Sequence, residues 1–360
     1  MNPASNRYCP FPCRSIWPLL HTLLLLSASV HFLVRCQGEA AAQERAKTEL
    51  ARPEITKLGT IECDLVEATP VVFKDELYRF EYVRARYRHN KLGQPYFRFI
   101  HVGTGRVTPP FARGYELGSA YAEADKMYAY GVKGWGTDTI YVFWSKDLRH
   151  WSSTIALKLP GWAIYNTSVC KGKDRYLMAF EVGRPAEVVG RPFTNRFAAS
   201  DDLIRWQLLP EPHVFTKDRY SACPSIRYLD GYFYMFYLEA QPGPTYETHL
   251  VRSPDLVHWE SSPLNPVLRH SPEDRRIANP RLSPAERKRI ATATNINNSD
   301  FDLCEYEGKV VIYYSWGNQH GVEHLAEAVY HGTLKQFLKG FFPCADGSRK
   351  LPQALRKGPP

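Results

Sequence analysis

Short apolar stretches alternate with turn residues along most of the chain, and five segments share one pattern. Each begins with a short apolar run, continues through a tight turn bearing Asp, Gly or Lys, and ends in a run rich in Tyr, Phe and Met: 71–82, 120–131, 169–181, 225–239 and 302–316. Two such runs joined by a tight turn predict a β-hairpin. Further strand-like sequence follows, as in 139–145 and 248–253. We therefore expect five sheets, each of about four strands.

A seven-residue motif, Ser-x-Asp-Leu-x-x-Trp, recurs three times at nearly constant spacing. The copies are SKDLRHW at 145–151, SDDLIRW at 200–206 and SPDLVHW at 253–259. Repetition at a period of about 50 residues is typical of propellers and related arrays. The sequence thus predicts an all-β fold, a five-bladed β-propeller with short helical insertions. We expect Ser and Asp to bind the turn backbone and each Trp to wedge between neighbouring sheets.

These patterns divide the chain into segments. The propeller is expected over 60–340, with a helical insertion at 269–294 in which Ser283 before Pro284 reads as a helix N-cap. Residues 43–59 are interpreted as a linker or short N-terminal helix, and residues 341–360 as a C-terminal tail.

The first residues resemble a targeting segment. Arg7 and Arg14 precede an apolar run over 16–34, and small residues follow at 40–42. This order predicts a signal peptide over 1–42, and hence a secreted or periplasmic protein without stable membrane insertion after cleavage. A retained membrane anchor is the alternative, because the run is about as long as a minimal spanning helix of about 18 residues.

Composition narrows the functional classes. A chain of 360 residues with 44% hydrophobic and 13% aromatic residues can bury a large core. The net charge of +9 is compatible with an anionic partner such as an acidic or sulfated glycan, a membrane surface or a nucleic acid. Because the basic residues are dispersed and no nucleic-acid-binding motif accompanies them, no nucleic-acid partner is expected.

The cysteines do not indicate a disulfide framework or a zinc knot. Beyond the leader the chain has an odd, scattered set: Cys63, Cys170, Cys223, Cys304 and Cys344. No CxxC pair or Cys/His cluster has zinc-ligand spacing, so buried thiols are the simpler interpretation.

Candidate acids come from the strand ends that a propeller brings to one mouth of its central channel: Asp302, Asp300, Glu67, Glu239 and Glu181. Asp300 and Asp302 are two residues apart on a strand, so we expect them to face the same way, although an Asx cap entering the strand is the alternative. Glu181 and Glu239 end apolar runs, where partial desolvation would raise the pKa as a general acid requires, unless an arginine pairs with them. Glu67 opens the first inner strand, where a solvated strand-end role is equally compatible.

Candidate substrate-binding residues form two groups. Polar side chains lie between glycines in the loop 317–323 or open an inner strand: His320, Gln319, Asn318, Glu323 and Asn166. Three aromatic residues are candidate sugar-stacking platforms, each with a core role as the alternative: Trp135, Tyr246 and Trp316.

On its repeated turns and DGYFYMFY-like hairpins, the sequence over 60–335 resembles the propeller glycoside hydrolases: family 43 arabinofuranosidases and xylosidases, invertase-like family 32 enzymes and family 117 anhydrogalactosidases. The resemblance implies a family 43 triad of two Asp and one Glu. At the matching positions this chain has Glu67 or Thr69, the segment 166–168, and Cys223. The triad therefore does not transfer, and the acids must come from the pool above.

These observations predict a carbohydrate-active enzyme that hydrolyses glycosidic bonds of an oligo- or polysaccharide in the central cleft, using acidic side chains. No cofactor is required, although a Ca²⁺ ion held by Asp300 or Asp302 in the channel is compatible with the sequence. The alternatives are a non-catalytic glycan-binding propeller and a protein-interaction scaffold.

Overall fold

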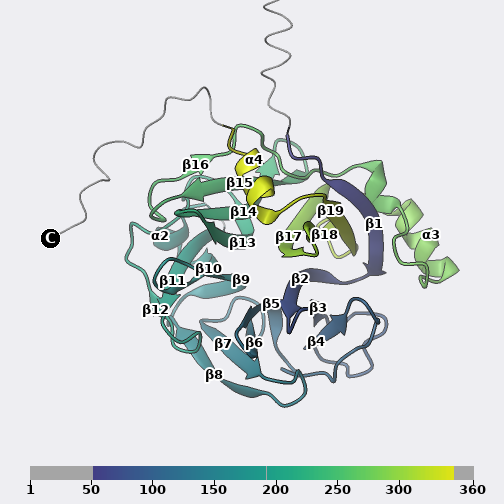
Figure 1. Cartoon of the computed structure of the whole chain (residues 1–360), viewed down its shortest axis with the longest axis horizontal. Helices are drawn as coiled ribbons and strands as arrows, with labels where there is room; N and C mark the ends of the chain where they lie inside the picture. Colours follow the sequence, from purple (N-terminus) through teal and green to yellow (C-terminus); the bar gives the residue numbers. More distant parts are fainter. Residues whose placement is uncertain (1–51, 192, 344–360) are drawn as a thin grey trace, which may run out of the picture. The chain divides into compact units, whose positions relative to one another are not determined.

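The computed structural model describes residues 52–191 and 193–343, and strands dominate this part of the chain (Figure 1). Three antiparallel sheets come first: β2–β4 (Val66–Phe73, Glu76–Val83, Tyr96–His101), β5–β8 (Glu116–Glu123, Lys126–Val132, Thr139–Ser145, Ser152–Lys158) and β9–β12 (Ala163–Lys171, Tyr176–Arg184, Thr194–Ser200, Gln207–Leu208). The other strands are β13–β16 (Ser221–Leu229, Tyr232–Gln241, Thr245–Ser253, Glu260–Ser261), β17–β19 (Asn297–Tyr306, Lys309–Gly317, Glu323–Tyr330) and β1 (Thr56–Cys63).

The strand groups follow one another around a common centre, with β2, β5, β9, β13 and β17 innermost (Figure 1). The strand β1 pairs antiparallel with β19, from Thr56 opposite Val329 to Cys63 opposite His324. One parallel bridge, Tyr246 with Asn297, links β15 to β17. Each of the five expected hairpins is present, and the all-β class with short helices is confirmed, whereas the number of blades stays a prediction.

The repeated motif forms one kind of turn between the third and fourth strands of a sheet. In the middle copy, the Ser200 hydroxyl accepts a hydrogen bond from Leu203 N at 3.0 Å. Asp202 Oδ1 accepts from the backbone N of the two residues after Leu203, at 2.9 and 2.8 Å. Leu203 has a left-handed backbone (φ 65°). The first and third copies repeat this pattern, so the expected role of Ser and Asp is confirmed.

The motif tryptophans join each sheet to the one before it. Their rings contact aromatic residues of the preceding group: Trp151 with Phe111 at 3.8 Å, Trp206 with Tyr130 at 5.7 Å, and Trp259 with Phe197 at 5.6 Å between ring centroids. Aromatic pairs at such distances contribute about 0.5–1.5 kcal/mol beyond their buried area. The predicted wedging of tryptophan between neighbouring sheets is therefore confirmed.

Helices are few and short in the described residues: α2 (Ala186–Val189), the 3-10 helix η1 (Pro272–Arg275), α3 (Pro284–Thr292) and α4 (Leu334–Gly340). Ser283 caps α3 as expected, because its hydroxyl accepts from Glu286 N. Two expected boundaries differ from the structure. The strand β1 begins at Thr56, within the segment interpreted as a linker, and Phe341 is buried in the core although the tail was expected to begin there.

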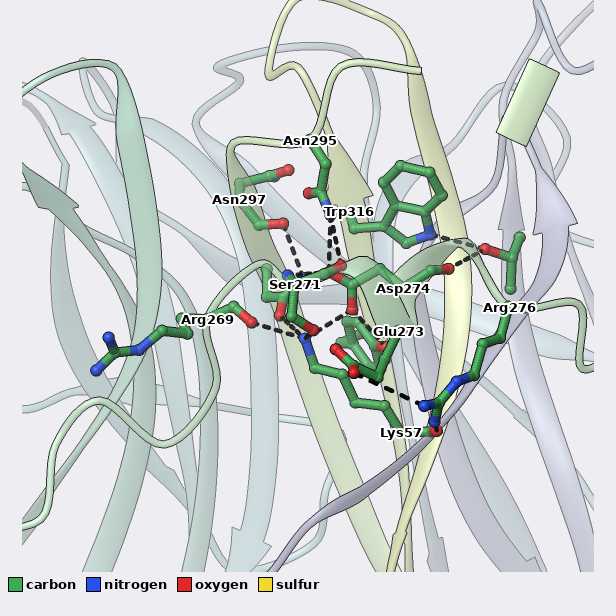
Figure 2. A network of polar contacts seen from close by, with 12 residues as sticks. Lys57, Arg269, Ser271, Glu273, Asp274, Arg276, Asn295, Asn297 and Trp316 are labelled. Atoms are coloured by element: carbon green, nitrogen blue, oxygen red, sulfur yellow. Dashed lines mark hydrogen bonds and ion pairs between the residues drawn. The ribbon is translucent and has the colours of Figure 1, made fainter. Parts of the chain in front are cut away.

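The expected insertion is anchored through Asp274, whose side chain is completely buried (Figure 2). Its carboxylate pairs with Lys57 Nζ at 2.7 Å and accepts from Asn295 Nδ2 and Tyr314 OH, both at 2.8 Å. The backbone N of Ser271 also donates to it at 2.8 Å. A buried carboxylate with this many donors is well compensated. The network holds η1 against β1 and β18.

Several expectations fall on residues outside those described: the signal peptide over 1–42, the linker over 43–51, Cys344 and the tail from 344. Among the described residues, no helix combines the length and apolarity needed to cross a bilayer. In the same part of the chain, Cys63, Cys170, Cys223 and Cys304 are free thiols, buried or half-buried.

Candidate functional site

The inner strands share a backbone irregularity at the same end. Register shifts occur in β2 after Val66, in β5 after Glu116, in β13 after Ala222 and in β17 after Ser299. The residue at each shift has a positive φ: Glu67 (56°), Leu117 (54°), Cys223 (52°) and Asp300 (51°). Asn166 lies at the matching shift between β9 and β10. Bulges re-aim side chains, and these five residues all line one cleft.

The cleft has a volume of about 570 Å³ and opens at the mouth formed by the inner strand starts, the second strand ends and the loop before β19. Glu67, Glu181 and Asp300 all line it. A narrow cavity, also lined by Glu67 and Asp300, continues inward to Asp302. Asp302 in turn lines a cavity of about 340 Å³ at the far ends of the inner strands. The structure therefore brings three of the five predicted acids into one cleft.

Glu181 is almost completely buried at the end of β10. Its Oε2 accepts hydrogen bonds from Cys223 N at 2.8 Å and from Asn166 Nδ2 at 3.3 Å. Burial raises the pKa of Glu181 to about 7, although these hydrogen bonds oppose the shift, and the charge of Asp300 adds to it. A carboxyl group with this pKa is protonated in a large fraction of molecules at neutral pH, as a general acid requires.

Glu67 has a desolvated carboxyl group. Its Oε2 is buried and has no hydrogen-bond partner among the described residues. Burial raises the pKa of Glu67 well above its ordinary value, and the charges of Asp300, Glu181 and Glu323 add to the effect, while Arg84 opposes it. An orphan buried oxygen of this kind is free to bind a substrate hydroxyl.

Asp300 accepts hydrogen bonds that favour its charged form. Burial raises its pKa, but hydrogen bonding by the Cys223 thiol opposes this, as does Ser299, whose hydroxyl donates to Oδ2 at 3.1 Å. Neighbouring carboxyl groups with different environments can take opposite roles in acid–base chemistry. Asp300 therefore suits the base or nucleophile and Glu181 the acid.

Asp302 has a different environment. It pairs with Arg227 Nη2 at 2.6 Å and accepts from Ser225 Oγ at 2.7 Å. The expectation that Asp300 and Asp302 alternate regularly on one face was wrong, because the bulge between Ser299 and Asp302 interrupts the two-residue period. Since Arg227 neutralises the Asp302 carboxylate, this residue does not fit a Ca²⁺ site.

Glu239 does not line the cleft. Its carboxylate accepts a hydrogen bond from Tyr237 OH at 2.6 Å, whereas the preceding residue, Leu238, lines the cleft. Side chains alternate along β14, so the carboxylate of Glu239 points to the opposite face from Leu238.

The loop between β18 and β19 contributes polar groups. Gln319, His320 and Glu323 line the cleft. Asn318 instead shapes the loop, because its Oδ1 accepts from His320 N at 2.9 Å and from Val322 N at 3.0 Å. Two residues absent from the sequence-based set, Arg84 and Arg86, also line the cleft. Arg84 Nη1 pairs with Glu323 Oε2 at 2.8 Å.

The aromatic candidates differ in accessibility. Trp135 lines the cleft, is 70% exposed, and contacts Tyr165 edge-on at 4.9 Å. Tyr246 is not among the cleft-lining residues and contacts the cleft-lining Tyr220 edge-on, with 5.8 Å between ring centroids. Trp316 is completely buried and its indole N donates to Thr60 Oγ1 at 2.8 Å, which excludes the expected stacking role.

No protein-family model matches the sequence, and no curated protein sequence matches it significantly. Solved structures do. One is a glycoside hydrolase with a TM-score of 0.53 and 14% identity, over 80% of this chain and 94% of that one. Another is an α-L-arabinofuranosidase from Lactobacillus brevis, with a TM-score of 0.54 and 12% identity over 79% and 96%.

A xylan β-1,4-xylosidase from Bacillus halodurans C-125 has a TM-score of 0.51 and 13% identity, over 76% of this chain and 54% of that one. At such identities the likeness concerns the fold. It confirms that the described chain has the propeller fold found in glycoside hydrolases, as the sequence resemblance implied.

Proposed function

We propose that the chain hydrolyses glycosidic bonds of an oligo- or polysaccharide bound in this cleft. The observation that carries the proposal is that Glu181, with a pKa of about 7, and Asp300, whose carboxylate accepts hydrogen bonds, line the same cleft. Glycoside hydrolysis requires one carboxyl group that donates a proton and one that acts as base or nucleophile.

Each residue then has a defined task. The Glu181 carboxyl group protonates the oxygen of the leaving sugar, and the Cys223 N–H and Asn166 amide stabilise the carboxylate left behind. Asp300 activates a water molecule or attacks the anomeric carbon. The Glu67 carboxyl group binds a sugar hydroxyl, because its buried oxygen otherwise lacks a partner. Trp135 offers an exposed ring face for stacking, and Gln319 and His320 offer hydrogen bonds at the rim.

The test uses purified protein and a panel of aryl glycosides and polysaccharides. Because two similar structures are named as an arabinofuranosidase and a xylosidase, pentose-containing substrates come first in the panel. Glu181→Gln and Asp300→Asn should each reduce kcat at least about 100-fold. Glu239→Gln is the matched control and should retain activity, since its carboxylate lies outside the cleft lining. Equal activity in all three variants would refute the assignment.

A non-catalytic glycan-binding function is the second candidate. Three of the five bulge positions that line the cleft hold residues without a carboxyl group, namely Leu117, Asn166 and Cys223. This shortage of acidic side chains favours binding without catalysis. Glycan arrays combined with product analysis separate the two functions. Retention of a glycan without any cleavage products, unchanged in Glu181→Gln, would support binding alone.

We further propose that the bound glycan carries an acidic group near the rim. Arg86 lines the cleft and has no ion-pair partner in the described part of the chain, and Arg84 Nη2 is buried without a hydrogen-bond acceptor there. Guanidinium groups bind carboxylates and sulfates bidentately. Arg86→Gln should weaken binding of a uronate-containing oligosaccharide and leave a neutral one unaffected.

We propose that the protein is exported, on the leader pattern over 1–42. Expression in a secretory host tests this, because the mature protein recovered from the medium should begin near residue 43. Retention of the intact N-terminus in the membrane fraction would favour the anchor instead.

A further inference from the structure

Three side chains that are distant in sequence meet outside the cleft. Glu62 belongs to β1, His89 to the loop between β3 and β4, and Glu286 to the first turn of α3. Each offers one ligand atom, and these atoms all lie within 4.8 Å of one another. No other group of three potential metal ligands in the described part of the chain has this geometry.

Hydrogen bonds from Ser283, which is not part of the group, hold the Glu286 carboxylate in place. Glu286 is nearly buried, and its Oε2 accepts hydrogen bonds from Ser283 N at 2.8 Å and Ser283 Oγ at 2.7 Å. This capping box leaves Oε1 directed at His89 Nε2, 3.0 Å away. Outer hydrogen bonds that orient a ligating carboxylate are a regular feature of metal sites.

Within this group the Glu62 carboxylate has little compensation. Glu62 has no ion-pair partner among the described residues, and its one hydrogen bond there comes from Cys63 N at 3.1 Å. The nearest cation to Glu286, the half-exposed Arg88, lies 3.9 Å from Oε1. A Glu62 carboxylate without a cationic partner, close to a second carboxylate and an imidazole nitrogen, favours a bound cation.

We propose that Glu62, His89 and Glu286 bind a divalent transition-metal ion of the zinc class. An imidazole nitrogen and two carboxylate oxygens suit Zn²⁺, whereas Ca²⁺ prefers oxygen ligands alone. A tetrahedral zinc ion holds its ligand atoms about 3.3 Å apart. Rotation of the half-exposed His89 side chain would bring its ring nitrogen to this distance from the two carboxylate oxygens. Three protein ligands leave one position for water. The ion would tie β1, the loop and α3 together.

The test is zinc titration of the full-length protein, after chelator treatment, by isothermal titration calorimetry with ZnCl₂. Wild type should bind zinc, and His89→Ala and Glu62→Gln should each weaken the zinc affinity at least about 10-fold. Loss of a residue that only hydrogen-bonds to a metal ligand already lowers metal affinity by about 10-fold or more. His150→Ala is the matched control and should bind as wild type, since His150 is an exposed histidine beside one carboxylate. Equal zinc stoichiometry and affinity in all four proteins would overturn the proposal.

A second measurement separates metal binding from a general loss of stability. Zinc should raise the midpoint of thermal unfolding for wild type and His150→Ala, because a ligand that binds the folded state stabilises it. The rise should be absent in His89→Ala and Glu62→Gln, whose circular dichroism spectra without metal should match wild type. The same zinc-dependent rise in those two variants would place the ion elsewhere in the chain.

Discussion

His324 should make the stability of the protein depend strongly on acid. This residue of β19 is completely buried, and neither ring nitrogen has a hydrogen-bond partner in the described chain. Its ring packs against Trp316, 4.7 Å away between centroids. Burial lowers the pKa of His324 from 6.5 to about 4, and the charge of Arg289 adds to the effect. The imidazole is therefore neutral in the folded protein at every pH above about 4.

The sign of the effect follows from proton counting. Between pH 6.5 and 4 the unfolded chain binds a proton at His324 that the folded protein does not, so stability falls as the pH falls. The pKa difference corresponds to about 3 kcal/mol, which is fully lost only below pH 4. His324→Phe keeps a ring of similar shape without titratable or unpaired polar atoms, so it should remove this part of the acid sensitivity.

The assay is urea unfolding at pH 7 and pH 4.5 for wild type, His324→Phe and the exposed control His331→Phe. Carboxylates also titrate in this range, so the informative quantity is the difference between variants. His324→Phe should lose about 2–3 kcal/mol less than wild type between the two pH values. The control should follow wild type. Identical losses in all three proteins would refute the account of His324.

Three further changes test the roles of Glu181 in catalysis, Trp206 between two sheets and Asp274 in the insertion. If Glu181 is the general acid, activity should fall as the pH rises above about 7, and Glu181→Gln should lack this limb of the pH–rate profile. Trp206→Ala should destabilise the protein by about 3–5 kcal/mol in urea unfolding, because it removes a buried wedge; a loss below about 1 kcal/mol would contradict the role. Asp274→Ala should cost about 3–5 kcal/mol by leaving Lys57 buried without its partner, whereas exposed Asp125→Ala should cost less than about 1 kcal/mol.

Local patterns in the sequence predicted the sheets well. The hairpins depend on a turn between two short runs, and the motif turns depend on Ser and Asp acting within three residues, as Ser200 and Asp202 do. Both features are decided by neighbours in sequence. The capped start of α3 at Ser283 was predictable for the same reason.

The direction of side chains at the cleft was harder to predict. A bulge adds one residue to a strand, so the spacing of Asp300 and Asp302 no longer reports which way each points. Glu181 and Glu239 end similar apolar runs. Glu181 lies at a register shift in the pairing of β10 with β9. Glu239 is regularly paired with Ser221, and its side chain points away from the cleft. One residue of register separates a cleft acid from a hydrogen bond with a neighbouring tyrosine.

Sequence patterns could not predict contacts between segments that are far apart along the chain. Trp316 and Trp135 were both candidates for sugar stacking on the sequence alone, yet the first is in the core and the second is exposed. The group of Glu62, His89 and Glu286 has no ligand spacing to recognise, because only the folded chain brings its three segments together.

The pairing of β1 with β19 has a consequence for the order of events during synthesis. The ribosome makes β1 before every other described strand, yet its partner is made after residue 322. Sheets such as β5–β8 can form as they emerge, while β1 waits with its hydrogen-bonding edge unsatisfied. We expect this waiting strand to be the segment most in need of chaperone protection, and truncation before β19 to leave a product prone to aggregation.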